Sequence, residues 1–281
     1  MCRIFGFRSV IQSQVHQSLV HAENALRIQS ERHPDGWGVA YYHAGTPHVI
    51  KSERSAVNDH IFRHISGVVS SETVVAHIRK TTVGQNSIIN THPFQFGPWV
   101  FVHNGNIKNF SSFKDQLVSQ INPELRRFIF GETDSEVIFY FLLSQLSNKI
   151  DLSRKDCPIE LLAKSLRDSL NLIQNIIGSY STNNSGPTDD TYLTFLITNG
   201  ATMIAHQGGK HLYYSTYKKR CSDRASCTSY SEVCENPSSS GQINHLIFSS
   251  EPLSGDNIWL SMQDGDLLGV DWKMKLTNFS K

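Results

Sequence analysis

The chain has 281 residues, which is enough for one large domain or two small ones with a sizeable buried core. Hydrophobic residues make up 39% and charged residues 18%, which is ordinary for a globular protein and excludes a disordered or fibrous chain. The 26 basic residues nearly balance the 25 acidic ones. This balance gives no electrostatic reason to expect binding to nucleic acid or to an anionic membrane surface, so small or neutral partners are favoured.

The N-terminal segment MCRIFGFRSV has no long apolar region and no small-residue cleavage site, so no secretory signal is predicted. The most apolar stretch, residues 137–146, is far shorter than the roughly 20 apolar residues that a membrane helix needs. The five cysteines are an odd number, which favours free thiols over a disulfide framework. Together these features predict a cytoplasmic location.

Alternation and turn signals predict strands and one helix in the first part of the chain. Residues 3–10 alternate weakly and predict a first strand. Residues 18–30 carry apolar side chains at mainly helical spacing, and Ser18 is a candidate N-cap, so a helix is expected there. Residues 37–44 and 47–52 flank a glycine turn and predict a β-hairpin.

The middle of the chain combines β runs with two clear helices. Residues 73–78 and 99–102 are rich in Val, Phe and Ile and predict strands. Between them lies a polar loop, residues 84–93, and loops so placed often carry functional sites. A helix is predicted for residues 132–146, opened by the capping-box sequence Thr-Asp-Ser-Glu, and another for residues 158–177.

The last third is rich in strands. Residues 192–198 and 202–207 are joined by Asn-Gly, the strongest short hairpin signal. Residues 218–242 contain few large apolar side chains, so we expect an exposed and mobile insertion. Further strands are predicted at 212–217, 245–250, 257–262 and 267–276. Strands, then helices, then strands again indicate an α+β fold, and we expect a single domain over residues 1–281.

Two clusters have the residue types of a metal site but not its spacing. Cys221, Cys227 and Cys234 lack the CxxC pairs of a zinc site, and no paired HxxxH follows them. His60 and His64 lie four apart in a predicted helix, but no third ligand is evident nearby. Neither a metal nor another cofactor is therefore predicted.

Cys2 is a candidate nucleophile because of its place in the chain. Removal of Met1 exposes it as the chain terminus, and the small side chain at position 2 favours that removal. Cysteine attacks as a thiolate and needs a base. The free α-amino group, with a reference pKa of about 7.7 to 8.0, can accept the thiol proton at neutral pH.

The motifs that follow Cys2 along the chain are a more specific signal than its position alone. Six short motifs follow one another, namely CRIFG from residue 2, DGWG from 35, HIR from 77, THP from 91, HNGN from 103 and TDSE from 133. Their order and spacing resemble the class II glutamine amidotransferases, and most closely the stand-alone branch that begins MC and carries HPDGWG. The resemblance runs from Cys2 to about Tyr140.

The resemblance implies an N-terminal-nucleophile hydrolase with a four-layer αββα fold and Cys2 as its nucleophile. Arg79 matches the arginine that binds the substrate α-carboxylate, with Thr82 adding a hydroxyl, and a guanidinium suits a carboxylate bidentately. Asp134 matches the acid that binds the α-ammonium group. Structural roles are the alternatives to substrate binding: Arg79 in a surface salt bridge, and Asp134 as an acid that complements a helix dipole.

Asn104 and Gly105 match the pair that forms the oxyanion hole, through a side-chain amide and a backbone N–H. Asn-Gly is also an ordinary turn, and the two interpretations are compatible. In relatives the His-Pro at His92 helps to build the pocket. In the family the HPDGWG motif packs near the nucleophile, so the resemblance implies that Trp37 walls the pocket and that Asp35 or Arg32 orders the terminus.

The leading hypothesis is hydrolysis of the γ-amide of glutamine or of a γ-glutamyl compound through a thioester on Cys2. Lys80 stands where sugar-phosphate amidotransferases have a tryptophan, so closure over the pocket differs. The alternatives are a glutaminase subunit that supplies ammonia to a separate synthase, a non-catalytic binder of γ-glutamyl metabolites, and an acylase for other amides. The sequence leaves open the amine or acceptor, the pathway, the oligomeric state and the role of the three later cysteines.

Overall fold

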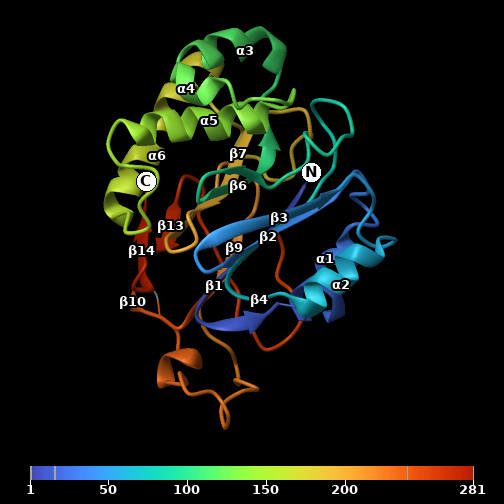
Figure 1. Ribbon diagram of the computed structural model, residues 1–281, viewed down its shortest axis with the longest axis vertical. Helices are drawn as coiled ribbons and strands as arrows, with labels where there is room; N and C mark the ends of the chain where they lie inside the picture. Colours follow the sequence, from blue (N-terminus) through green and yellow to red (C-terminus); the bar gives the residue numbers. More distant parts are fainter. Residues whose placement is uncertain (1, 16, 239, 281) are drawn as a thin grey trace.

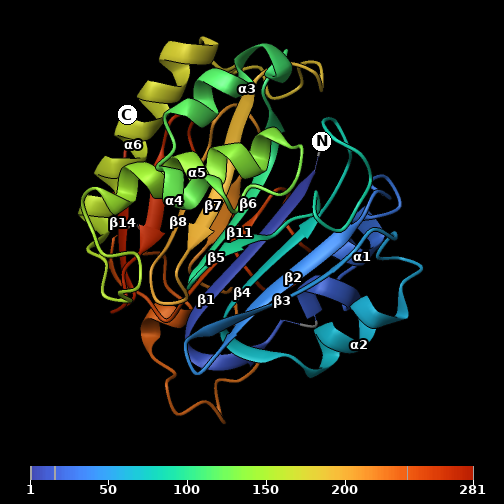
Figure 2. The same cartoon turned by 45° about the horizontal axis from the view of Figure 1, so that its top comes forward.

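Two seven-stranded sheets form the centre of the molecule in a computed structural model, which describes residues 2–15, 17–238 and 240–280 (Figures 1 and 2). The first sheet has the order β12-β9-β11-β1-β4-β2-β3 and the second the order β10-β14-β13-β8-β7-β6-β5, and among the described residues neighbouring strands pair antiparallel. The strands of the first sheet are β1 (Arg3–Gln14), β2 (Trp37–His43), β3 (Thr46–Ser52), β4 (Ser70–Ile78), β9 (Tyr213–Ser215), β11 (His245–Ser249) and β12 (Leu260–Ser261). Those of the second are β5 (Phe94–Phe96), β6 (Trp99–Asn106), β7 (Tyr192–Thr198), β8 (Met203–His206), β10 (Gly241–Gln242), β13 (Leu267–Val270) and β14 (Lys275–Phe279).

Helices cover the outer face of each sheet, so the chain has four layers (Figure 2). Beside the first sheet lie a π-helical turn η1 (Gln17–His21), α1 (Leu26–Gln29) and α2 (His60–Val68); beside the second lie α3 (Phe110–Ser119), α4 (Pro123–Arg126), α5 (Asp134–Ser147) and α6 (Ile159–Ile177). Three apolar cores separate the layers, one between the sheets and one under each set of helices. The predicted α+β fold with an αββα arrangement is confirmed.

Side-chain alternation along β1 explains how one strand serves two cores. Ile4 faces the core between the sheets, whereas Phe5 and Phe7 face the core under α1 and α2. All three are buried, and each such side chain contributes about 1.5 to 3 kcal/mol when removed from water. Side chains that alternate along β1 therefore pack in two different cores, one on each face of the first sheet.

The single helix expected over residues 18–30 is wrong. The segment forms η1 and α1, and Ala25 between them is extended with ψ 159°. The apolar side chains at helical spacing are buried all the same, since Leu19 and Leu26 pack in one core under the first sheet. Ser18 lies inside η1 rather than at a helix start, so its predicted N-cap role is also wrong.

Strand β6 is longer than the sequence indicates. It continues beyond residue 102 to Asn106, and Asn104 and Gly105 pair with Thr194 and Leu193 of β7. The Asn-Gly pair is therefore in a strand and not in a turn. The predicted hairpins β2–β3 and β7–β8 and the helices α5 and α6 are present, whereas α3 and α4 had no sequence prediction.

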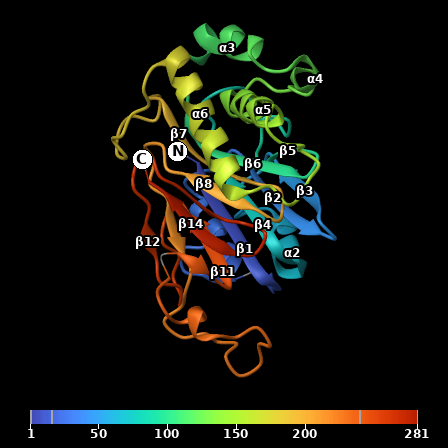
Figure 3. The same cartoon turned by 90° about the vertical axis from the view of Figure 1, so that its left-hand side faces the viewer.

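The segment 218–242, orange in Figure 3, extends from the end of the molecule opposite α3 and α4. It contains a 3₁₀ turn, η2 (Glu232–Cys234), and ends in β10. Most of its described side chains are exposed or half-buried, as expected, but Cys234 is buried and its carbonyl accepts a hydrogen bond from Lys218 N at 2.8 Å. In the described parts of the chain, no helix is both long and apolar enough to cross a membrane.

Candidate active site

Cys2 lies at the start of β1, which runs between β4 and β11 in the first sheet. Two residues along, Ile4 pairs with His77 of β4 on one side. On the other side the Ile4 backbone N–H donates to Ser250 Oγ at 2.9 Å, and the Ile4 carbonyl accepts from Ser250 N at 3.0 Å. A strand held along both edges fixes the position of the thiol.

The Cys2 thiol contacts the backbone of Lys80. Lys80 N donates to Sγ at 3.3 Å, and Sγ lies 3.4 Å from Lys80 O, to which it donates. Burial raises the pKa of the thiol, and the Lys80 N–H and the nearby Arg79 charge offset only part of that increase. The resting thiol is therefore protonated at neutral pH, and attack on a carbonyl requires a base.

Asp35 braces the backbone that contacts the thiol. Its carboxylate accepts a hydrogen bond from Thr81 N at 2.8 Å, and its own N–H donates to Arg79 O at 3.2 Å. Arg79 N donates in turn to Gly36 O at 2.8 Å. These bonds tie the Pro-Asp-Gly turn to the loop that follows β4, and so hold Lys80 against Cys2.

Arg79 is buried at the end of β4 and does not form a surface salt bridge. Its Nη1 donates to Asn86 Oδ1 at 3.3 Å, and its Nη2 lies 3.2 Å from Gln85 O and 3.4 Å from Val83 O. These acceptors are neutral and the bonds are long. A carboxylate would form shorter, charge-assisted bonds with the same donors.

Asp134 is the first residue of α5 and is buried. Its Oδ2 accepts a hydrogen bond from Ile107 N at 2.6 Å, and its Oδ1 accepts one from Ser135 N at 2.8 Å. Each carboxylate oxygen thus holds one backbone N–H. A carboxylate has about four acceptor positions, so the remaining lone pairs are available to a cation.

His103 keeps the hydroxyl proton of Ser135 away from Asp134. His103 Nε2 lies 3.0 Å from Tyr192 O, which only accepts, so this nitrogen carries the proton. Burial lowers the pKa of His103, and a neutral ring leaves Nδ1 as an acceptor for Ser135 Oγ at 2.9 Å. The Ser135 proton therefore points to His103, although Asp134 Oδ1 is 3.3 Å from the same hydroxyl.

Asn104 and Gly105 lie next to this network in β6. A side chain at Gly105 would place its Cβ 2.0 Å from Tyr192 O, so only glycine fits. Asn104 is buried, and its Oδ1 has no hydrogen-bond partner among the described residues. A buried acceptor without a partner costs about 1 to 3 kcal/mol, so the side chain is held for something other than local stability.

One small cavity brings together Cys2, Arg79, Gly105 and Asp134. Its volume is about 20 Å³, which is room for one water molecule and not for an amino acid. The structure therefore describes a closed site. The remaining lining residues are Lys80, Thr82, Val83, Asn90, His92, His103, Thr133 and Ser135.

His92 lines the cavity as a neutral ring. Burial lowers its pKa, and the ring centroid is 4.2 Å from that of His77, whose pKa burial lowers to about 3. Two such close imidazoles cannot both carry a proton in this environment. His92 is thus placed to shape the cavity.

Asp35 and Trp37 of the HPDGWG segment, and Arg32 just before it, lie outside the cavity lining. Trp37 is not a pocket wall, which corrects the sequence prediction, because its position in β2 points the indole toward α2. The Trp37 ring lies 5.0 Å from that of Phe62, and its Nε1 donates to Asp59 Oδ2 at 3.1 Å. Arg32 is exposed, and Asp35 acts through the Thr81 backbone.

Sequence reasoning missed His103, Ser135 and the Lys80 backbone as parts of the site. The first two lie inside the HNGN and TDSE motifs, so the motifs mark these positions but do not indicate what each side chain does. The contact of Lys80 depends on backbone geometry and has no sequence signal. Across residues 2–15, 17–238 and 240–280, no group of three or more His, Cys, Asp or Glu side chains could hold a metal ion.

Comparison with known proteins agrees with this geometry. The model of the family described as glutamine amidotransferases class-II matches residues 1–273. The chain belongs to the class II glutamine amidotransferases. A probable glutamine amidotransferase, DUG3, from Saccharomyces cerevisiae is 30% identical over 73% of the chain and 62% of its own length, and a putative glutamine amidotransferase of Haemophilus influenzae is 28% identical over 73% and 63%. The chain thus spans less than two thirds of these relatives.

A more distant relative is the γ-glutamyl-hercynylcysteine sulfoxide hydrolase of Mycobacterium tuberculosis, 30% identical over 37% of the chain and 49% of its own length. Among solved structures, a glutamine aminotransferase class-II domain protein from Silicibacter pomeroyi superposes with a TM-score of 0.62 at 20% identity, covering 99% of the chain and 98% of that protein. The family is one of enzymes with an N-terminal cysteine, and Cys2 stands at that position here.

Proposed function

We propose that this class II glutamine amidotransferase hydrolyses the γ-amide of glutamine or of a γ-glutamyl compound through a thioester on Cys2. The observation that carries the proposal is that a thiol, a guanidinium and a carboxylate line one small cavity together. Arg79 suits the α-carboxylate of an amino acid, and Asp134 suits its α-ammonium group. A head group held by both would present its side-chain amide to Cys2.

The chemistry begins with the α-amino group that removal of Met1 frees on Cys2. This amine takes the thiol proton, and Sγ bonds to the γ-carbonyl carbon. The resulting oxyanion accepts hydrogen bonds from Gly105 N–H and the Asn104 amide, and each such donor commonly contributes about 3 to 4 kcal/mol. The C–N bond breaks as the protonated amine gives its proton to the leaving nitrogen, and a thioester remains.

The second step restores the enzyme. Water loses a proton to the same amine and attacks the thioester carbon, and the C–S bond breaks. Glutamate leaves and the thiolate of Cys2 recovers its proton. No redox change occurs in either step, so no cofactor is needed for the balance of atoms and electrons.

Substrate entry requires the closed cavity to open. The loop after β4 supplies Arg79, Lys80, Thr82 and Val83 to the cavity, and its residues 84–89 are largely exposed or half-buried. Exposed loops move on faster timescales than buried strands. We infer that this loop moves outward to admit substrate and returns before the amide is attacked.

The function is tested on purified protein whose intact mass shows that Met1 is absent. Glutamine and a panel of γ-glutamyl amides are supplied, and glutamate release is measured; a glutamine-analogue electrophile is then used to label Cys2. We expect release and labelling, and loss of both in Cys2→Ala. Processed protein that releases no glutamate and takes up no label contradicts the proposal and favours a non-catalytic binder.

A glutaminase subunit that delivers ammonia to a separate synthase is the second candidate. The amidotransferase names of the Saccharomyces cerevisiae and Haemophilus influenzae relatives favour it. Copurification of a synthase that stimulates glutamate release would support this candidate. The cytoplasmic location and the absence of nucleic-acid partners stay predictions.

A further inference from the structure

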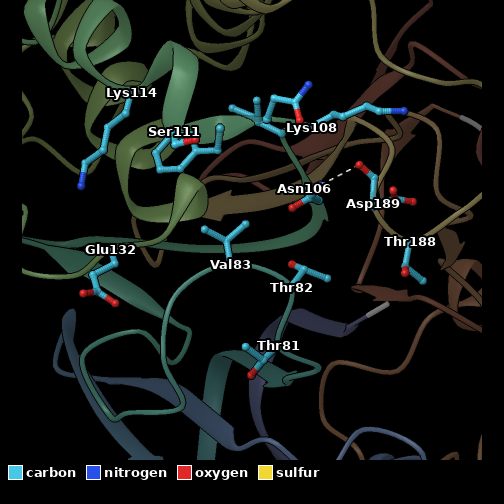
Figure 4. Close-up of a pocket in the computed structure, with 13 residues that line it drawn as sticks. Thr81, Thr82, Val83, Asn106, Lys108, Ser111, Lys114, Glu132, Thr188 and Asp189 are labelled. Atoms are coloured by element: carbon cyan, nitrogen blue, oxygen red, sulfur yellow. Dashed lines mark hydrogen bonds between the residues drawn. The ribbon is translucent and has the colours of Figure 1, made fainter.

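A second cavity, of about 620 Å³ (Figure 4), lies next to the Cys2 cavity and shares lining residues with it. Thr82 and Val83 line both and form the wall between them. Two other segments pass from one to the other, since β6 contributes Gly105 to the small cavity and Asn106 to the large one, and Glu132 of the large cavity precedes Thr133 of the small one. The two are successive compartments.

The outer cavity is far larger than the reaction of glutamine requires. Ammonia, the leaving group of glutamine, is about the size of a water molecule, which occupies roughly 30 Å³. A volume of 620 Å³ lies in the range of small-molecule sites, about 300 to 1,000 Å³. Resting on the function proposed above, we propose that this cavity binds the amine portion of a γ-glutamyl amino acid or short γ-glutamyl peptide that ends in a free carboxylate.

The lining carries two basic side chains, Lys108 and Lys114, and two acidic ones, Glu132 and Asp189, and Lys114 is the basic group available to a carboxylate. Lys108 Nζ is 3.0 Å from Asp190 Oδ1 and is already paired, whereas Lys114 of α3 takes part in no ion pair recorded among the described residues. The N-cap of α3, Asn109, makes no side-chain hydrogen bond to the first turn, and although the N–H groups of Phe110 and Ser112 donate to Ile107 O and Asn109 O, the helix dipole adds positive potential at this N-terminus. Figure 4 shows Lys114 pointing down from α3 into this end of the cavity.

The remaining lining fits a peptide. Val83, Ile107 and Phe110 provide apolar surface, and Thr81, Ser111 and Thr188 provide hydroxyl groups. Glu132, the acid on the Lys114 side, accepts a hydrogen bond from Gln85 N at 3.3 Å and so is engaged with the loop that carries Arg79. Amide and carboxylate groups of a short peptide satisfy this mixture better than an apolar amine does.

Binding to Cys2→Ala protein, which cannot form the thioester, tests the cavity separately from catalysis. Calorimetry would compare glutamine, a γ-glutamyl dipeptide and the same dipeptide with its C-terminal carboxylate amidated. We expect the dipeptide acid to bind at least about tenfold tighter than glutamine, because it fills the outer cavity. Lys114→Met should weaken the acid by roughly threefold to fivefold and leave the amidated dipeptide and glutamine unchanged.

Lys164→Met, on the exposed face of α6, is the matched control and should change none of the three affinities. A dipeptide that binds no tighter than glutamine, or a Lys114→Met effect equal for acid and amide, overturns the inference. Glutamate release by the unmodified enzyme distinguishes failure of the outer site from failure of the proposed function. Release from glutamine with no preference for the peptide rejects only the outer site, whereas no release and no binding of any γ-glutamyl compound rejects the proposed function as well.

Discussion

Asp134 is the residue whose role is most open to a direct test. Its carboxylate is held by Ile107 N and Ser135 N, while His103 takes up the proton of the Ser135 hydroxyl. The acceptor capacity that remains is available to a cation. An α-ammonium group is the cation that the proposed substrates supply.

We predict that Asp134→Asn raises KM for glutamine by roughly tenfold to a hundredfold, because a hydrogen bond to a charged group contributes about 1.5 to 3 kcal/mol. Steady-state kinetics of glutamate release would measure it. Glutaramic acid, which is glutamine without the α-amino group, is the control substrate. Its release of glutarate should be poor and equal in both proteins, and a loss of the same size for both substrates would contradict an ammonium contact.

The buried histidines predict how stability depends on pH. Burial lowers the pKa of His33 and of His77 to about 3, below the unfolded value of about 6.5. As pH falls below 6.5 the unfolded chain binds protons that the folded chain cannot, so the stabilisation present above 6.5 is lost toward pH 3. Urea unfolding between pH 7 and 4.5 should show a falling free energy of unfolding, by up to about 1.4 kcal/mol per pH unit for each such histidine.

His33→Gln should make that slope shallower, because one of these groups is removed. His64→Gln is the matched control, since His64 is exposed on α2, and it should leave the slope unchanged. A free energy of unfolding that is flat or rises as the pH falls through this window would show that the histidines are not buried as neutral rings.

The motifs correctly identified several residues that line the cavity. They did not predict on which face of a strand a side chain lies. Arg79, Asp134 and Gly105 share one cavity with Cys2, as the motifs implied. Trp37 was placed on the wrong side, because the motif gives nearness along the chain and not the direction of a side chain in β2. Asn104 lies beside the cavity without lining it in this closed state.

At the scale of elements, prediction worked where one local pattern decides the structure. The two hairpins, α5 and α6 have strong turn, cap or periodicity signals. Over residues 18–30, by contrast, burial under the first sheet prevails over helical spacing, and η1 and α1 form instead. Strand β6 continues to Asn106 because β7, about 90 residues further along the chain, supplies its pairing partner. A prediction from local sequence periodicity cannot detect so distant a partner.

Gly38 in β2 illustrates how closely the elements around the site pack. A Cβ at this position would lie 2.1 Å from His92 O, which is backbone and cannot rotate away. We predict that Gly38→Ala destabilises the protein by about 1 to 3 kcal/mol and lowers kcat/KM, because His92 must shift. Urea unfolding and glutamate release would measure the two effects.

The matched control for Gly38→Ala is Thr46→Ala at the exposed start of β3, which should change stability by less than about 0.5 kcal/mol. If Gly38→Ala is as stable and active as this control, the approach of His92 to β2 is looser than the structure indicates.

At the scale of the whole molecule, the core between the two sheets holds the site together. Phe248 of β11 is fully buried there and pairs with Gly6 of β1. We predict that Phe248→Ala lowers the free energy of unfolding by about 3 to 5 kcal/mol, because it leaves a cavity between the sheets. Denaturant titration would measure the loss, with Phe130→Ala as the control, since that ring is 70% exposed. Equal effects of the two changes would mean that the sheets do not pack as described.

The position of β1 between β4 and β11 has a consequence for the life of the protein in the cell. The contact of Ile4 with Ser250 spans 246 positions, so during synthesis the cysteine leaves the ribosome long before the residue that secures its strand. Under the proposed function, an unfinished or truncated chain has the reactive thiol but no fixed place for it. Amidase activity would then arise only from copies that extend through residue 250, which spares the cellular γ-glutamyl pool from shorter translation fragments.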